Sequence, residues 1–160
     1  MLLALELFVM LVLANGCPVI AARLLHQRGN RPVDGGRLWR DGRPIFGPSK
    51  TWRGLLSGTI VCLGFSAWVG LGWLFGALFG LVALTGDLIS SFIKRRLGLT
   101  SSARALWLDQ LPEAVLPMIV AWLWLPILLW QAIAVALLFA VCNMVFSPVL
   151  YRLGIRKQPH

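Results

Sequence analysis

Two long segments with almost no charge limit what this chain can fold into. Residues 55–93 form a run of 39 residues whose only charged side chain is Asp87, and residues 114–150 form a run of 37 residues with none. As single helices these runs would be ~58 Å and ~55 Å long, which is about twice the ~30 Å hydrocarbon core of a bilayer. Each run therefore predicts two membrane spans joined by a short turn.

A fifth apolar segment covers residues 1–22, where Glu6 and Asn15 are the only interruptions. A cleaved signal peptide is the alternative, but such a peptide begins with positive charges, whereas the first charge here is Glu6. We therefore expect a retained span. The predicted fold is an all-α, polytopic membrane protein, a single integral-membrane domain over residues 1–160. The five expected spans lie at about 2–22, 53–70, 73–93, 112–128 and 131–151.

The basic residues predict how these spans are oriented. All fifteen Lys and Arg residues fall in three places: eight in 23–53, four in 94–111 and three after residue 150. Five spans put all three on one side, which the positive-inside rule makes cytoplasmic. We therefore expect a multi-pass protein of the inner (cytoplasmic) membrane with two basic cytoplasmic loops, its N-terminus outside and its C-terminus in the cytoplasm. Topology explains the net charge of +9, so no nucleic-acid partner is predicted.

One helical face inside the third span carries polar side chains. Asp87, Ser90, Ser91 and Lys94 follow the i, i+3, i+4, i+7 spacing that places residues on the same side of a helix. A carboxylate within a span costs roughly 2.5–3.5 kcal/mol on insertion scales, which makes it a functional-site candidate by default. The alternative is a hydrogen-bonded packing residue.

The carboxylates of the cytoplasmic half stand among Lys and Arg residues, and Asp109 and Glu113 join Asp87 there. Mg²⁺ binds through one or two carboxylates and takes its other ligands from phosphates and water, while Arg and Lys bind the remaining phosphate charge. This composition favours a site for Mg²⁺ and a polyphosphate. The alternative is that the basic residues only set the topology and contact anionic lipid headgroups.

Three ordered blocks resemble the archaeal CDP-archaeol synthases and their short bacterial relatives. The first is Ala14-Asn15 with Pro18-Val19, and the second is residues 34–54, with the core DGRPIFGPSKTWRG. The third is residues 86–98, GDLISSFIKRRLG, followed by LDQL at 108–111. The match extends from residue 14 to about residue 113. The bacterial CDP-diacylglycerol synthases are similar more distantly.

The resemblance implies a CTP-dependent cytidylyltransferase that joins CTP to a lipid phosphate of the membrane and releases pyrophosphate. Its product would be a CDP-activated lipid of the CDP-archaeol or CDP-diacylglycerol kind. By the same comparison Asp87, Asp109 and Lys94 are the catalytic candidates, and Asp87 and Asp109 hold Mg²⁺. The candidate substrate-binding residues are Arg43, Ser49, Lys50, Thr51, Arg53, Ser91 and Arg95.

The sequence leaves several questions open. The family's aspartate after Leu111 is replaced by Pro112-Glu113, and the sequence does not decide whether Glu113 takes over as a metal ligand. It also does not decide which lipid tail the substrate carries or whether the protein forms a homo-oligomer. A non-catalytic membrane protein that binds anionic lipid, or a transporter subunit, is the alternative function. Neither explains why Asp87 and Ser90 share a face with Lys94.

Overall fold

The computed structural model describes residues 2–26, 28–99 and 106–152, and the regular structure within these ranges is helical. Five helices follow one another: α1 (Leu2–Leu25), α2 (Trp52–Trp68), α3 (Trp73–Arg96), α4 (Leu106–Trp124) and α5 (Leu129–Arg152). Strand-like pairing in the described residues is limited to two isolated bridges between α1 and α2. The all-α fold class is therefore confirmed.

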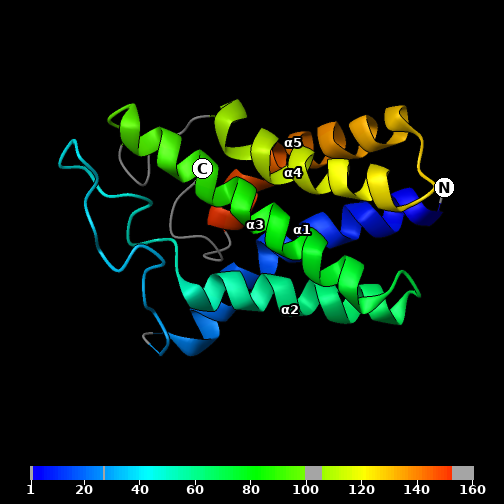
Figure 1. Ribbon diagram of the computed structural model, residues 1–160, viewed down its shortest axis with the longest axis horizontal. Coiled ribbons are helices and arrows are strands. Elements are labelled where there is room, and N and C mark those ends of the chain that lie inside the picture. The colour runs from blue at the N-terminus through cyan, green and yellow to red at the C-terminus, as the bar shows by residue number, and fades with distance from the viewer. Residues whose placement is uncertain (1, 27, 100–105, 153–160) are drawn as a thin grey trace.

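Helix α3 lies at the centre of the arrangement. It packs against α2, α4 and α1, while α5 packs against α4 and α1. Figure 1 shows the helices running in alternating directions along the long axis, so the segment between α1 and α2 lies at the same end as the last turns of α3 and the start of α4. The short turns α2–α3 and α4–α5 lie at the opposite end. The candidate residues from three elements thus share one end of the molecule.

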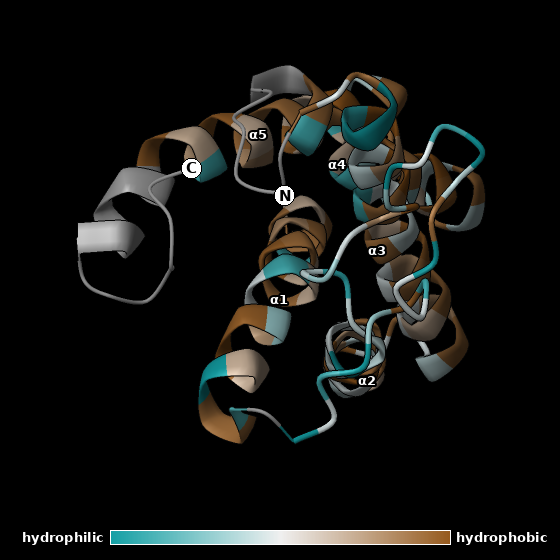
Figure 2. Ribbon diagram, turned by 90° about the vertical axis from the view of Figure 1, so that its left-hand side faces the viewer, coloured by the Kyte–Doolittle hydropathy of each residue, from teal (hydrophilic) through white to brown (hydrophobic). Residues whose placement is uncertain are grey.

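The interior is built from apolar helix side chains. Leu7 and Met10 of α1, Cys62 of α2, and Phe75 and Phe79 of α3 are almost completely buried. Figure 2 shows the contrast between the hydrophobic helices and the largely hydrophilic segment between α1 and α2. Within the described ranges, α1 and α3 are long and apolar enough to cross a membrane, judged by length and composition.

Two glycines of α3 allow neighbouring helices to approach closely. A side chain at Gly76 would overlap Ser66 and lie 2.5 Å from the backbone oxygen of Cys62 on α2. A side chain at Gly86 would overlap the backbone oxygen of Pro112 on α4 and lie 2.6 Å from its carbonyl carbon. Close approach through small residues is how helices associate in lipid, where burial of apolar area gives no driving force.

The start of α4 differs from the sequence-based expectation. We predicted a span opening at Pro112 and placed Asp109 in the preceding loop, but α4 begins at Leu106, so Asp109 stands in its first turn and Pro112 lies inside the helix. The placement of Asp109 in a loop was wrong. A carboxylate is favourable in the first turn, where it faces the positive end of the helix dipole. Neighbouring helices also make an internal proline tolerable in an apolar bundle.

Candidate functional site

The polar face predicted for residues 87–94 points into the bundle. Ser90, Ser91 and Lys94 are buried, and the side chain of Asp87 is 28% exposed. The Ser90 hydroxyl donates to the backbone oxygen of Gly86 at 3.0 Å, one turn earlier. The Ser90 hydroxyl is therefore satisfied within α3. The charged groups of this face are Asp87 and Lys94.

Asp87 is bound by a lysine from a distant part of the chain. The ammonium nitrogen of Lys50 lies 2.6 Å from both carboxylate oxygens of Asp87. The two side chains are 22% and 28% exposed, so the pair is partly screened from water. Charge-assisted hydrogen bonds of this length are among the strong ones in proteins. The contact joins the loop before α2 to the first residue of the α3 polar face.

The backbone around Lys50 holds it in place. The N–H of Val33 donates to the Lys50 oxygen at 2.8 Å, and the Lys50 N–H donates to the Gly47 oxygen at 3.2 Å. The next residue, Thr51, is the N-cap of α2, and its hydroxyl oxygen accepts from the N–H of Gly54 at 3.2 Å. Thr51, a predicted substrate-binding residue, thus caps the N-terminus of α2. Ser49, on the other side of Lys50 in the chain, is exposed.

A second lysine–aspartate pair joins α3 to α4. The ammonium nitrogen of Lys94 lies 2.9 Å and 3.1 Å from the two carboxylate oxygens of Asp109. The Lys94 side chain is only 9% exposed, whereas that of Asp109 is 36% exposed. A buried ammonium requires a partner, because removing it from water without one is unfavourable. The pair therefore anchors the first turn of α4 against the end of α3.

Asp87 and Asp109 are the carboxylates that could serve as Mg²⁺ ligands. Asp87 and Lys94 are seven residues apart on α3, so their backbone positions are ~10 Å apart along the helix axis. In the described part of the chain, no three His, Cys, Asp or Glu side chains cluster as a metal cage. Two carboxylates suffice for Mg²⁺ when a bound phosphate supplies further oxygens. Asp87 and Asp109 thus have the donor chemistry for Mg²⁺, and one ion would bind both only if the two carboxylates came together around a bound phosphate.

The three predicted substrate-binding arginines donate hydrogen bonds to backbone carbonyl oxygens. Arg43 donates to the oxygens at the end of α3, including that of Arg96 at 2.9 Å, and Arg95 donates to the Phe46 oxygen at 3.4 Å and to Leu99. Arg53 donates to the oxygens of the segment after α1 at 2.7 Å and 2.8 Å. A guanidinium has five N–H donors, so these bonds leave some of them for another ligand.

Asp34 organises the loop that carries Lys50, and the sequence analysis did not single it out. One of its carboxylate oxygens accepts from the N–H groups of Phe46 and Gly47, both at 2.9 Å, and the other from that of Gly36 at 2.9 Å. Burial raises the pKa of this carboxyl, but the hydrogen bonds from Gly47, Phe46 and Gly36 favour its ionised form. The pKa of Asp34 therefore lies below its ordinary value. The signal in the sequence was that Asp34 directly precedes Gly35-Gly36 and opens the second block of the family resemblance.

Replacing Asp34 with asparagine is expected to loosen this loop. The amide keeps one acceptor, but its NH₂ group faces backbone donors, so some of the N–H groups lose their acceptor, at about 1–3 kcal/mol for each buried donor left without one. Hydrogen exchange at the amides of Phe46 and Gly47, followed by mass spectrometry, should become faster. Asp41→Asn, in the same loop, should leave these two amides slow. Equal acceleration by both variants would contradict the role of Asp34.

The same carboxylate predicts a pH dependence. A lowered folded pKa means that ionised Asp34 stabilises the loop at pH values above its unfolded pKa of about 3.9. This contribution is lost as the pH falls through the folded pKa. Protection of the Phe46 amide should therefore fall in the wild type only as the pH drops below about 3.9, and Asp34→Asn should not show this fall.

Glu113 is a further buried carboxylate, and it lies on α4 one turn after Asp109. It is 6% exposed, and one of its oxygens accepts from the side-chain amide of Asn143 on α5 at 3.2 Å. The contact ties α4 to α5. It was left open in the sequence analysis whether Glu113 is a metal ligand, and this hydrogen bond gives the residue a structural role of its own.

Comparison with known proteins adds to this geometry. A family model described as CarS-like, CDP-archaeol synthase, matches residues 62–160. A CDP-archaeol synthase of Sulfurisphaera tokodaii is 34% identical over 140 residues, which cover 82% of this chain and 83% of that protein. Others, from Thermococcus onnurineus and Pyrococcus furiosus, are 40% and 45% identical over 109 and 107 residues. The chain spans about 60% of the length of these last two relatives.

A solved structure is also similar. It is described as an intramembrane enzyme for archaeal membrane lipid biosynthesis, and it is 31% identical to this chain with a TM-score of 0.73. The superposition covers 89% of this chain and 90% of the other. The similarity therefore extends over most of the chain.

Proposed function

Because the chain belongs to the CDP-archaeol synthase family, we propose that it is a membrane cytidylyltransferase that makes a CDP-activated lipid from CTP and a lipid phosphate. The observation that carries this proposal is the pair of lysine–aspartate contacts at one end of α3. They involve two carboxylates and two ammonium groups from three elements, and both include a residue of the α3 polar face. A non-catalytic lipid-binding protein or a transporter subunit is not favoured, since the relatives are synthases.

In the proposed reaction an oxygen of the lipid phosphate attacks the α-phosphorus of CTP. A new P–O bond forms as the bond to the β-phosphate breaks, and pyrophosphate leaves. The attacking phosphate is already an anion, so the site needs no strong general base. Reactions of this type depend mainly on positioning and on stabilising charge.

Side chains of this protein supply both the positioning and the positive charge that the reaction needs. Lys50 and Lys94 carry compact charges on flexible stems, and each lies beside a carboxylate from which it can turn towards a phosphate. Arg43 and Arg95 keep further donors close to the same end of α3. Asp87 and Asp109 would hold Mg²⁺, which supplies positive charge to the triphosphate when bound.

The proposed topology has five membrane spans, one for each helix. The loop between α1 and α2, the segment after α3 and the C-terminal segment are cytoplasmic, because all fifteen basic residues lie in them or in the helix turns that adjoin them. The last turns of α3 then meet CTP at the cytoplasmic surface of the inner membrane, while the lipid tails remain among the helices.

Cysteine labelling tests this orientation. In a variant without native cysteines, a thiol at Arg28 should resist an impermeant reagent added to intact cells, and a thiol at Trp68, at the opposite end of the bundle, should react. Both sites are exposed, so burial does not decide the result. Reaction at Arg28 from outside would overturn the orientation.

An assay of the purified chain tests the activity. Labelled CTP, Mg²⁺ and lipid phosphates with either isoprenoid ether or diacyl tails are supplied in detergent, and release of pyrophosphate and a CDP-lipid is measured. We expect pyrophosphate release that requires both the lipid and Mg²⁺. A folded preparation that binds no CTP and releases no pyrophosphate with any lipid phosphate would refute the proposed function.

A further inference from the structure

Residues 37–45 form an ordered hairpin at the cytoplasmic end of the bundle. The N–H of Trp39 donates to the Arg43 oxygen at 2.8 Å, and that of Ile45 donates to the Arg37 oxygen at 3.2 Å. Gly42 turns the chain with a φ of +73°, a value that glycine adopts without strain. Residues 38–40, which form the first arm of the hairpin and lead into its turn, are therefore held in a defined position.

The hairpin is attached to the end of α3. One Arg96 guanidinium nitrogen lies 2.6 Å from an Asp41 oxygen, and another donates to the Pro44 oxygen at 2.6 Å. The same guanidinium lies 5.0 Å from the centre of the Phe92 ring, within the range of a cation–π contact. The contacts with Asp41 and Pro44 join the hairpin directly to the last turn of α3.

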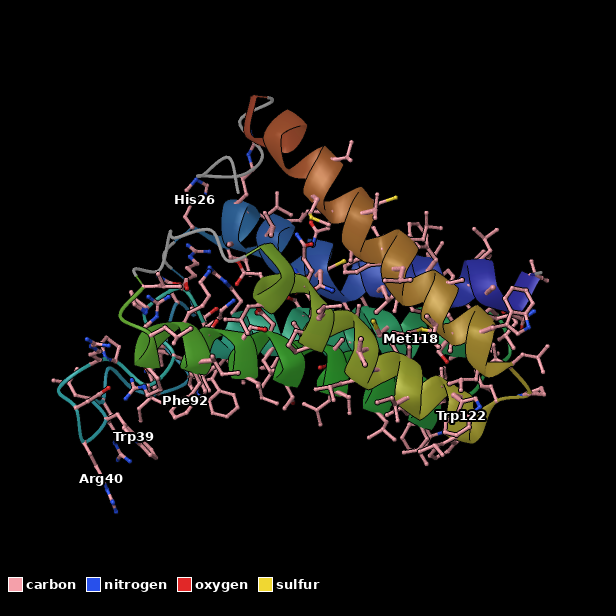
Figure 3. The ribbon with its side chains drawn as sticks, turned by 90° about the horizontal axis from the view of Figure 1, so that it is seen from above. His26, Trp39, Arg40, Phe92, Met118 and Trp122 are labelled. Carbon is pink, nitrogen blue, oxygen red and sulfur yellow. The ribbon has the colours of Figure 1, made fainter. Side chains whose placement is uncertain are left out.

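An apolar strip continues from α3 onto the hairpin. Leu81, Ile89 and Phe92 follow one helical face, and Leu81 and Ile89 are 44% and 42% exposed. The Trp39 ring packs edge-on against Phe92 with centroids 5.3 Å apart, yet Trp39 remains 47% exposed and Leu38 61%. Figure 3 shows Trp39 and Phe92 on the same outer side of α3. The outer face of this span therefore extends past the helix end.

Cations border this strip. Arg37 and Arg40 are exposed, and Figure 3 shows Arg40 pointing away from the bundle beyond Trp39. Tryptophan is enriched at the level of the lipid headgroups, and each Lys or Arg near an anionic membrane surface contributes about 1 kcal/mol of attraction. The order apolar helix face, then Trp39, then Arg40 matches the order hydrocarbon, interface, phosphate along the membrane normal.

We infer that residues 38–40 are a membrane-interface anchor, with Leu38 and Trp39 at the boundary of the hydrocarbon and Arg40 on anionic headgroup phosphates. The loop that carries this anchor also carries Lys50, and Asp34 links the two parts through Phe46 and Gly47. The anchor therefore sets the depth of the Lys50–Asp87 pair relative to the lipid phosphates. This inference rests on the membrane topology of the proposed function.

Spin labels measure the depth directly. Nitroxides are attached to Trp39→Cys, Leu81→Cys and Arg31→Cys in a cysteine-free background, in nanodiscs of anionic or of zwitterionic phospholipid. Collision rates with oxygen, which concentrates in lipid, and with a water-soluble nickel chelate are compared. Leu38→Cys provides a second label in the anchor. We expect the oxygen-to-nickel ratio to be highest at 81, several-fold higher at 39 than at 31, and lowest at 31.

The lipid dependence tests the role of Arg40. The ratio at position 39 should be higher in anionic than in zwitterionic nanodiscs, and Arg40→Gln should remove this difference, whereas Arg31→Gln should retain it. If the oxygen-to-nickel ratio at position 39 equals that at position 31 while the ratio at position 81 shows lipid exposure, the anchor is overturned and the topology stands. Nickel access at 81 equal to that at 31 overturns the topology and the anchor with it.

Discussion

Asp87→Asn is expected to lower CTP turnover by at least ~10²–10³-fold, the effect of losing one electrostatic contact in an active site. The substitution keeps the shape of the side chain but removes the charge that faces Lys50 at 2.6 Å and that would hold Mg²⁺. Folding should survive, because the pair is partly exposed and the amide can still accept a hydrogen bond from the ammonium. Turnover and thermal unfolding in detergent are measured on the same preparation.

A matched control separates chemistry from structure. Asp41→Asn removes the charge from another carboxylate with a 2.6 Å ion pair at the same end of the molecule, and it should reduce turnover far less. The exchange variant, Lys50→Asp with Asp87→Lys, restores an ion pair but moves the carboxylate to the loop, so it should remain inactive. If Asp87→Asn keeps full turnover and only lowers stability, Asp87 is a packing residue and the proposed site loses its centre.

Gly86→Ala should prevent α3 and α4 from packing as they do in the native protein. The added methyl group would overlap the Pro112 oxygen and lie 2.8 Å from the Glu113 nitrogen, and backbone atoms cannot move aside as a flexible side chain can. Overpacking of a core generally costs about 1–3 kcal/mol, and contact with backbone belongs at the upper end of this range or beyond. Thermal unfolding in detergent should shift to lower temperature, and turnover should fall because Asp87 and Asp109 stand on the separated helices.

Gly64→Ala on α2 is the corresponding control. A side chain at Gly64 meets nothing within 4 Å, so this change should be neutral or stabilise the helix by up to about 1 kcal/mol, the intrinsic advantage of alanine over glycine. If Gly86→Ala unfolds at the same temperature as Gly64→Ala, α3 and α4 are not held at the close approach described here.

The sequence alone was enough to predict the all-α fold and the division of its apolar runs into helices, although α4 begins earlier than expected. Run length and hydropathy are properties of consecutive residues, so residues 55–93 had to divide near Gly70, and α2 and α3 do meet there. Helical spacing likewise placed Asp87 and Lys94 on one face. The family could be inferred as well, because motifs such as residues 86–98 are contiguous.

The pairing of charges was decided by the tertiary structure. Lys50 and Asp87 are 37 residues apart, and local spacing carries no information about which lysine meets which carboxylate. The roles of Asp34 and of the arginines, whose donors go to backbone carbonyls, depend on how the loop folds against α3. The need for glycine at position 86 likewise comes from the tertiary structure, because the backbone of Pro112 lies where a side chain would be. Ion pairs and close contacts are set by distance in space, and that distance exists only once the bundle has packed.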